Sequence, residues 1–309
     1  MTEYSIGVDL GGTNLRAAAI DEDGRMLEKI AGSTHLSAGR EAVLDDMVRA
    51  IVELRERFKG HRLAGVGIGV PGFILVDDGL IVGSPNLPDF ENYPVRDEIE
   101  KRLGTPVILE NDANSAALGE KWMGAGRDVN DLVLLTLGTG IGGGVIHGGK
   151  VLHGFVGMGG ELGHITVNPT GNPCGCGNRG CLEKHASATA LVAMAKLLSL
   201  GGPDITAAGI YDLAVAGNTK ARMIFETMGE ALGIALANLV NIFNFPLYLL
   251  SGGPLPAWDF FAPRMLAEVE RRSFAYRNTK TRIARAELGN EAGLYGAACL
   301  PLKFQHAHH

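Results

Sequence analysis

The sequence lacks several features that would place it in a large class of proteins. No apolar run reaches the roughly 18 residues that a membrane-spanning helix needs. The opening residues, MTEYSIGVDL, show no basic segment followed by an apolar stretch and a cleavage site, as a secretion signal would. Basic residues are fewer than acidic ones: the chain has 28 Lys and Arg but 34 Asp and Glu, which gives a net charge of −6. We therefore expect a cytoplasmic protein that binds neither a membrane nor a nucleic acid.

Cysteine is scarce, and its distribution is uneven. The chain has four, of which Cys174, Cys176 and Cys181 are crowded together. In a chain without a secretion signal, such crowding favours a metal site over disulfides. Cys299 lies far away in an apolar segment and is predicted to be a core residue. The P-loop pattern that ends in Gly-Lys-Ser or Gly-Lys-Thr is absent too, so a nucleotide would need other binding groups.

Glycine, in contrast, is abundant. There are 44 Gly in 309 residues, and many stand in short clusters where backbone must turn tightly or approach a ligand. With 46% hydrophobic and 20% charged residues, the chain can bury the core of one large domain or of two ordinary ones.

Strand and helix patterns alternate along the chain, which predicts an α/β protein. Residues 4–10 and 15–21 are apolar strands around a Gly-Gly-Thr turn, and residues 131–152 repeat this strand–turn–strand pattern. The repetition indicates two related halves. Elsewhere the spacing of apolar residues predicts helices and strands in the following segments: helices 40–58, 95–103, 113–124, 187–200, 221–244 and 289–302, and strands 63–70, 106–112 and 246–254.

We place the domain boundary near Ala116. The first domain is then residues 1–116 with a C-terminal helix at about 291–304, and the second is residues 117–290, which include the cysteine-rich loop. The last five residues, QHAHH, are set aside as a frayed end.

Three glycine turns, each after a predicted strand, indicate nucleotide binding. Their members are Asp9, Gly11, Gly12 and Thr13; Gly138, Thr139 and Gly140; and Gly252 and Gly253. Glycine lets backbone N–H groups approach phosphate, and the Thr hydroxyls add donors. Asp9 would hold Mg²⁺ through water, because a carboxylate repels phosphate. Each turn alone could be an ordinary hairpin; the three together favour a polyphosphate nucleotide.

One imidazole and three thiols stand in a short glycine-rich stretch and predict a zinc site. The ligands would be His164, Cys174, Cys176 and Cys181. Three Cys and one His close a tetrahedron and leave no position for a reactive water, so this zinc would be structural. A reduced or redox-active thiol cluster is the alternative, although Cys-x-Cys is not the redox spacing.

Asp112 follows a predicted strand and begins a predicted helix. Ligands of α/β proteins bind at this edge, where a carboxylate can orient a hydroxyl for phosphoryl transfer and accept its proton. The same position also suits a helix N-cap, a role that Asp often fills.

Six motifs in order across almost the whole chain resemble the ROK family of bacterial sugar kinases and sugar-responsive repressors. They are DLGGT, SPNLP, LENDANSAALGE, LGTGIGGG, GELGH and CGCGNRGCLE. The resemblance implies an actin-like ATPase (ribonuclease H-like) fold, with two α/β domains around a cleft. It also implies Asp112 as catalytic base with Asn111 beside it. Sugar contacts would come from Asn86, Glu161, His164 and Glu183.

The resemblance further implies that His164 connects the zinc to the sugar, with one ring nitrogen on the zinc and the other directed towards the sugar. Many relatives carry Lys after Gly-Gly-Thr, whereas this chain has Asn14, which would supply no cationic contact to the nucleotide. The expected reaction is ATP-dependent phosphorylation of a hexose at its 6-hydroxyl, with glucose favoured because SPNLP resembles glucose-specific members.

Other functions stay open on the sequence. Kinases of N-acetylmannosamine, N-acetylglucosamine, mannose and fructose share nearly all these motifs. A repressor would need a helix-turn-helix segment ahead of DLGGT, where the sequence leaves no room, and the net charge is acidic. A non-catalytic sugar sensor is disfavoured because the base and the phosphate turns are intact. A homodimer or a dimer of dimers is the default expectation from symmetry.

Overall fold

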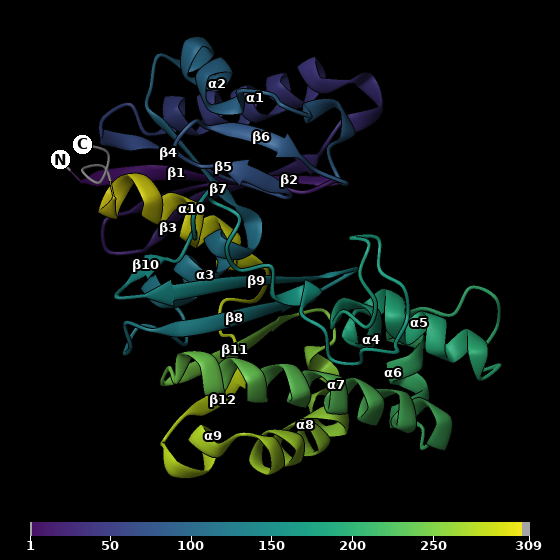
Figure 1. Cartoon of the computed structure of the whole chain (residues 1–309). Coiled ribbons are helices and arrows are strands. Elements are labelled where there is room, and N and C mark those ends of the chain that lie inside the picture. Colours follow the sequence, from purple (N-terminus) through teal and green to yellow (C-terminus); the bar gives the residue numbers. More distant parts are fainter. Residues whose placement is uncertain (1, 305–309) are drawn as a thin grey trace. The chain divides into compact units, whose positions relative to one another are not determined.

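The computed structural model describes residues 2–304 of the chain, and the C-terminal QHAHH segment set aside above lies outside them. The chain divides into two compact units (Figure 1). Unit 1 comprises Met1–Asn130, Gly144–Gly160 and Glu287–His309, and unit 2 comprises Asp131–Gly143 and Glu161–Ala286. Both units combine a β-sheet with helices, so the predicted α/β class is confirmed.

Unit 1 is built on a five-stranded sheet of order β3-β2-β1-β4-β7. β1 pairs antiparallel with β2 and parallel with β4, which in turn runs parallel to β7. The central strands are buried on both faces, as their unbroken apolar sequences predict. The strands are β1 (Glu3–Leu10), β2 (Asn14–Asp21), β3 (Met26–Ser33), β4 (Arg62–Val70) and β7 (Val107–Asn111), with a separate hairpin of β5 (Phe73–Leu75) and β6 (Leu80–Gly83).

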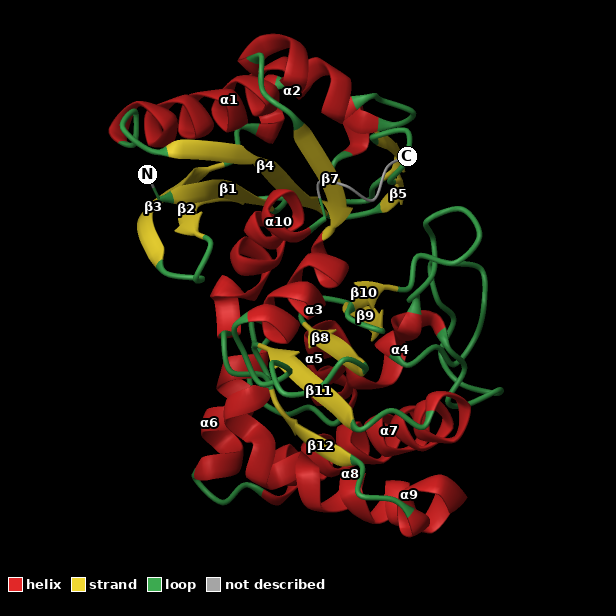
Figure 2. Cartoon of the chain, turned by 90° about the vertical axis from the view of Figure 1, so that its left-hand side faces the viewer, coloured by secondary structure: helices red, strands yellow, loops and turns green. Residues whose placement is uncertain are grey.

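Helices cover both faces of this sheet. In Figure 2, α1 (Arg40–Arg57) and α2 (Val95–Leu103) lie on one face, and α3 (Asp112–Trp122) and α10 (Ala292–Lys303) on the other. α10 approaches β4 so closely that a Cβ added at Gly67 would overlap the Ala297 carbonyl oxygen. Gly296 of α10 is held as tightly against the Ser115 carbonyl of α3. Glycine is therefore required where the C-terminal helix docks on unit 1.

Unit 2 carries most of the second sheet, of order β10-β9-β8-β11-β12. β8 (Leu132–Leu137), β11 (Leu247–Gly252) and β12 (Arg282–Arg285) run parallel, whereas β9 (Ile141–His147) crosses the unit boundary and β10 (Lys150–Val151) belongs to unit 1. The helices are α4 (Glu183–Ala186), α5 (Ala188–Leu197), α6 (Ala207–Val215), α7 (Thr219–Phe243), α8 (Trp258–Arg272) and α9 (Phe274–Asn278).

The helix α7 qualifies the expectation that no segment could span a membrane. By length and composition, this 25-residue helix is apolar enough to do so. Its most apolar stretch is 67% buried inside the structure, where Gly229 and Gly233 pack against the backbone of α8. The composition of α7 is that of a core helix.

The domain boundaries of the structure differ from the predicted ones. The predicted division near Ala116 falls inside α3, a continuous helix that packs against α10. A domain boundary inside a helix would interrupt its continuous backbone hydrogen bonds. The chain instead passes from unit 1 to unit 2 for the first time in the loop after α3, at Asn130. Residues 144–160 also belong to unit 1, because β9 and β10 return the chain there. Sequence patterns made no prediction for residues 258–285, which hold α8, α9 and β12.

Gly67→Ala tests the close docking of α10 on β4. The added methyl must displace the Ala297 backbone, so we expect a loss of about 1–3 kcal/mol in the free energy of unfolding. Gly32→Ala, in β3 of the same sheet, has nothing within 4 Å of its new methyl and serves as the control. Urea denaturation measures both, and equal midpoints for the two variants would contradict the close packing of α10 on β4.

Candidate functional site

The junction of β7 and α3 positions Asp112. Asn111 is the N-cap of α3: its Oδ1 accepts from the amides of Ala113 at 2.9 Å and Asn114 at 3.2 Å. Its Nδ2 donates to the carbonyl oxygen of Gly72 at 3.1 Å. The capping role considered for Asp112 is thus filled by its neighbour, and the polar atoms of Asn111 are engaged within the protein.

Asp112 is the first residue of α3 and is half-buried. Its Oδ1 accepts from the Ala113 amide at 2.8 Å. The N-terminal end of a helix favours negative charge, so this position stabilises an ionised carboxylate. The side chain therefore stands at the carboxyl end of a parallel strand, at the edge where the sequence places a catalytic base.

The first glycine turn joins β1 to β2. Its Gly11 N–H group donates to the Asn14 carbonyl oxygen at 2.8 Å and so closes the hairpin. Gly11 therefore does not present its own N–H group to an anion, and the nucleotide contacts predicted for this turn reduce to Gly12, Thr13 and Asn14. A Cβ on Gly12 would lie 3.6 Å from the Asn86 carbonyl oxygen, so Asn86 adjoins this turn within unit 1.

Asp9 lies at the end of β1, with 14% of its side chain exposed. It forms an ion pair with Arg16 of β2, and Arg16 also donates to the Asn290 carbonyl oxygen at 2.6 Å. Burial raises the pKa of Asp9, and the nearby Glu291 adds to this, whereas the charge and hydrogen bond of Arg16 oppose it. The carboxylate of Asp9 is thus already paired with the cation of Arg16, and a bound metal ion would have to compete with Arg16 for it.

The second glycine turn lies between β8 and β9. Gly138 N–H donates to the Gly140 carbonyl oxygen at 2.9 Å. Glu183, at the start of α4, accepts from the Ile141 amide at 3.2 Å, and a Cβ on Gly140 would collide with the Glu183 carboxylate. A predicted sugar ligand and a predicted phosphate turn are therefore adjacent in unit 2.

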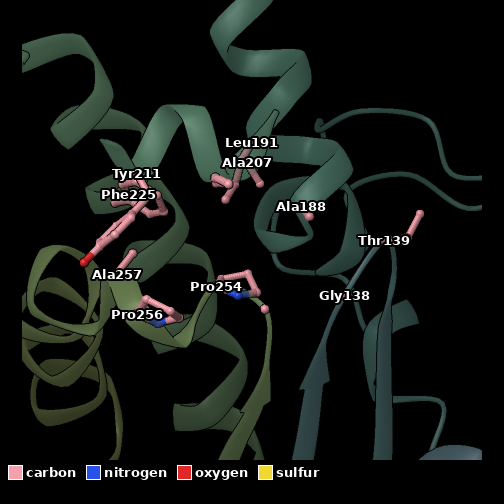
Figure 3. Close-up of a pocket in the computed structure, with 12 residues that line it drawn as sticks. Gly138, Thr139, Ala188, Leu191, Ala207, Tyr211, Phe225, Pro254, Pro256 and Ala257 are labelled. Atoms are coloured by element: carbon pink, nitrogen blue, oxygen red, sulfur yellow. The ribbon is translucent and has the colours of Figure 1, made fainter. Parts of the chain in front are cut away.

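A cavity of about 420 Å³ opens beside this turn, large enough for a nucleoside. Figure 3 shows Thr139 at one end of the pocket and Tyr211 with Phe225 at the other. Gly253 and Pro254 of the third glycine turn form part of the wall. Gly252 has a φ of 110°, and a Cβ there would overlap the Leu137 carbonyl oxygen, so that turn requires glycine. The second and third turns thus border one pocket.

The apolar walls of this pocket were not predicted from the sequence. They are contributed by Ala188, Leu191, Ala207, Ala208, Tyr211, Phe225, Pro256 and Ala257. In the sequence these residues are apolar positions of helices, and nothing distinguishes them from core residues. Phe225 is in fact also a core residue, since it stacks on Phe260 with ring centroids 6.1 Å apart.

The four predicted metal ligands converge. The ligand atoms of His164, Cys174, Cys176 and Cys181 all lie within 4.8 Å of one another. His164 Nδ1 is 3.6 Å from Cys174 Sγ, and the sulfurs of Cys176 and Cys181 are 3.6 Å apart. The left-handed glycines Gly177 (φ 90°) and Gly180 (φ 66°) bend the loop around them.

The chemistry of this donor set fits a closed zinc site. Burial raises the pKa of Cys181 to about 12, whereas hydrogen bonding from the Asn178 backbone lowers the pKa of the exposed Cys176. A cation placed among the sulfurs would displace the Cys181 proton, because a thiolate is the binding form.

His164 also connects the cysteine cluster to a predicted sugar ligand. Its Nδ1 faces the sulfur of Cys174, and its Nε2 lies 4.0 Å from Glu161 Oε2. Burial raises the pKa of Glu161, as does the charge of Glu183, against the opposing effect of His164. The electrostatic coupling of Glu161 to both residues places the three predicted sugar ligands of unit 2 in one neighbourhood.

Comparison with known proteins identifies the family of this chain. The model of the ROK family matches residues 5–303. The chain belongs to the ROK family. It is 40% identical over 308 residues to a glucokinase of Thermotoga maritima, an alignment that covers 96% of each chain.

Solved ROK structures are similar over the same extent. A ROK hexokinase from Thermus thermophilus is 38% identical with a TM-score of 0.85, covering 96% of each chain. A ROK family glucokinase from Streptomyces griseus, in complex with glucose and AMPPNP, is 35% identical with a TM-score of 0.80, covering 96% of this chain and 98% of the other. The fold of this ROK protein is therefore the actin-like ATPase fold expected from its motifs.

Proposed function

We propose that this ROK protein transfers the γ-phosphoryl group of ATP to the 6-hydroxyl of a hexose, with glucose as the preferred acceptor. The observation that carries the proposal is the β7–α3 junction, where Asn111 caps the helix and Asp112 occupies its first turn. Full-length similarity to a glucokinase and to a kinase structure holding glucose and an ATP analogue supports the choice of substrates.

Asp112 is the proposed catalytic base. Phosphoryl transfer to an alcohol needs a carboxylate that orients the hydroxyl and finally takes its proton. The strand end and the cap fix the backbone on either side of Asp112, which limits the positions its carboxylate can take. Asn111 is proposed beside it; because its amide is hydrogen-bonded to Gly72 and to the helix, its main contribution is to hold this turn.

Sugar hydroxyls are proposed to contact Asn86, Glu161, His164 and Glu183. Carboxylates accept from sugar hydroxyls, whereas an amide or an imidazole can both accept from and donate to them. A site of this kind rejects analogues that leave its polar groups unpaired. The proximity of Glu161 to His164, and its electrostatic interaction with Glu183, support a shared role for the three.

ATP is proposed to place its base in the pocket of unit 2 and its phosphates at the glycine turns. The phosphate contacts would be N–H groups and hydroxyls of Gly12, Thr13, Asn14, Thr139 and Gly140. Asp9 would hold Mg²⁺ through water, and the ion supplies positive charge that neutralises the phosphate oxygens during transfer. The apolar walls of the pocket favour a base held largely by packing.

Zinc is proposed at His164, Cys174, Cys176 and Cys181 as a structural ion. It would order a loop that has few apolar side chains, and it would hold the His164 ring so that Nε2 faces Glu161.

We also propose a cytoplasmic location and assembly as a homodimer or a dimer of dimers. Light scattering of the purified protein tests the oligomeric state.

Asp112→Asn is the variant that tests the base. Because the amide keeps the shape and loses the proton-accepting charge, we expect kcat to fall by about 10²–10⁴-fold. The affinity for glucose, measured by calorimetry, should stay within about tenfold of the wild type. Asp23→Asn removes an exposed acid from the same unit and is the control. Loss of glucose binding together with turnover would assign Asp112 a structural role instead.

A panel of sugars tests the acceptor. In a coupled assay of ADP release, we expect glucose to give the highest kcat/KM among glucose, mannose, fructose, N-acetylglucosamine and N-acetylmannosamine. Discrimination between sugars that differ in one polar group can reach several orders of magnitude when the site hydrogen-bonds that group. A higher kcat/KM for an N-acetyl sugar would correct the substrate and leave the phosphoryl transfer intact.

Cys176→Ser tests the zinc. Cys176 is exposed, so its replacement costs little packing, and any large effect reports on the metal. We expect about one zinc per wild-type chain by elemental analysis, loss of that zinc in the variant, and a fall in Tm. Cys299→Ala, which removes a buried thiol outside the cluster, should keep its zinc. A wild-type protein purified with zinc available yet free of it would refute the site.

A further inference from the structure

The carboxylate of Glu110 is a buried charge next to the proposed base. Glu110 precedes Asn111 at the end of β7 and is 1% exposed. Its Oε1 accepts from the Asn111 amide at 2.9 Å and from Asn114 Nδ2 at 3.0 Å. These two donors lie on either side of Asp112 in the chain. A buried carboxylate keeps its position only while its oxygens are hydrogen-bonded, so its partners matter for this turn.

The second oxygen of Glu110 is bound by a residue from a different segment. Glu110 Oε2 lies 2.7 Å from His153 Nε2. His153 begins a glycine-rich loop that leads to Glu161, one of the proposed sugar ligands. The loop is closed at its neck, because the Gly159 amide donates to the His153 carbonyl oxygen at 2.7 Å. The position of the His153 ring therefore affects where this loop starts and ends.

The remainder of the loop touches the backbone of β5 at Gly157, where an added Cβ would lie 2.7 Å from the Ile74 carbonyl oxygen, but its tip is exposed. Gly154 (φ 73°), Gly157 (φ 85°) and Gly160 (φ 92°) have left-handed backbone, which glycine adopts without strain. The side chain of Phe155 at the tip is fully exposed, and that of Val156 is 45% exposed. With so little packing at the tip, the hydrogen bond at the neck is an important restraint on the loop.

A cavity gives the solvent access to this hydrogen bond. It measures about 240 Å³ and is lined by Val76, Asp77, Ile108, Glu110, Leu118, Lys150, Val151, His153, Leu300 and Phe304. The His153 side chain is 34% exposed, whereas that of Glu110 is 2% exposed. His153 can thus exchange a proton with water while its partner remains buried.

We propose that the Glu110–His153 hydrogen bond is a positioning device for phosphoryl transfer: it fixes the turn that carries Asp112 and the loop 153–160 together. This inference rests on the proposed function. Glu110 and His153 act through Asn111, Asn114 and the loop, and neither is proposed to touch the substrate. The pair joins two segments of unit 1 that are 43 residues apart in the sequence.

The charges around His153 make the device dependent on pH. Burial lowers the pKa of His153, but the hydrogen bond and charge of Glu110 and the charge of Asp77 outweigh it, so the net pKa is raised above 6.5. Lys150 of β10 lines the same cavity, and its positive charge disfavours the protonated form of His153. The residues of α3 and α10 that line the cavity are apolar. Because the pKa of His153 is higher in the folded than in the unfolded protein, the Glu110–His153 pair stabilises the fold fully at a pH below the unfolded pKa. This stabilisation is lost as the pH rises through the folded pKa.

Three variants test the pair. His153→Phe keeps a ring but removes the donor, and we expect kcat to fall by about 10–100-fold through misplacement of the turn. KM for ATP should stay within about twofold, because the proposed base pocket is lined by residues of unit 2. His153→Gln retains a donor that does not titrate, so kcat at pH 7 should recover to within about threefold and lose its alkaline decline. His147→Gln, which removes another imidazole, is the control.

A second measurement is independent of turnover. Nuclear magnetic resonance titration of the His153 ring should give a lower pKa in Glu110→Gln than in the wild type, because the variant removes the partner charge. An unchanged His153 pKa, or a His153→Phe enzyme with wild-type kcat and pH profile, would overturn the inference. So would a His153→Gln enzyme as slow as His153→Phe. A wild-type enzyme that phosphorylates no sugar would instead overturn the proposed function.

Discussion

The hydrogen bonding around the end of β7 is the constraint on which the proposed chemistry depends. Glu110 brings a buried charge to this strand end, and Asn111 caps the helix that follows. Together they determine the backbone from which Asp112 projects. Because the cap and the buried carboxylate are neighbours of Asp112 in the chain, small changes in either would move the proposed base without touching it.

The first two glycine turns are closed by similar but not identical hydrogen bonds, from Gly11 to Asn14 in unit 1 and from Gly138 to Gly140 in unit 2. In each, the first glycine closes the hairpin through its own N–H group, and the residues after it remain for a ligand. Glycine is needed in the second turn for a steric reason as well, since Gly140 leaves room for the Glu183 carboxylate. Space for a ligand and space for a neighbouring side chain are thus provided by the same residues.

The sequence was sufficient for the fold class, the repeated strand–turn–strand pattern and the convergence of His164 with the three cysteines, because each rests on local periodicity or close spacing. It was insufficient where distant segments meet. The contact of His153 with Glu110 and the pocket walls at Tyr211 and Phe225 depend on tertiary packing. The domain boundary near Ala116 was wrong for a related reason: α3 belongs to unit 1 through its packing on α10.

The identity of the product tests the proposed chemistry most directly. With ATP, Mg²⁺ and glucose, phosphorus nuclear magnetic resonance of the wild-type reaction should show a new phosphomonoester on the 6-oxygen of glucose, formed in step with ADP. Release of inorganic phosphate with ADP, and no sugar phosphate, would mean that water is the acceptor and would contradict the central role of Asp112 as the base that directs a sugar hydroxyl.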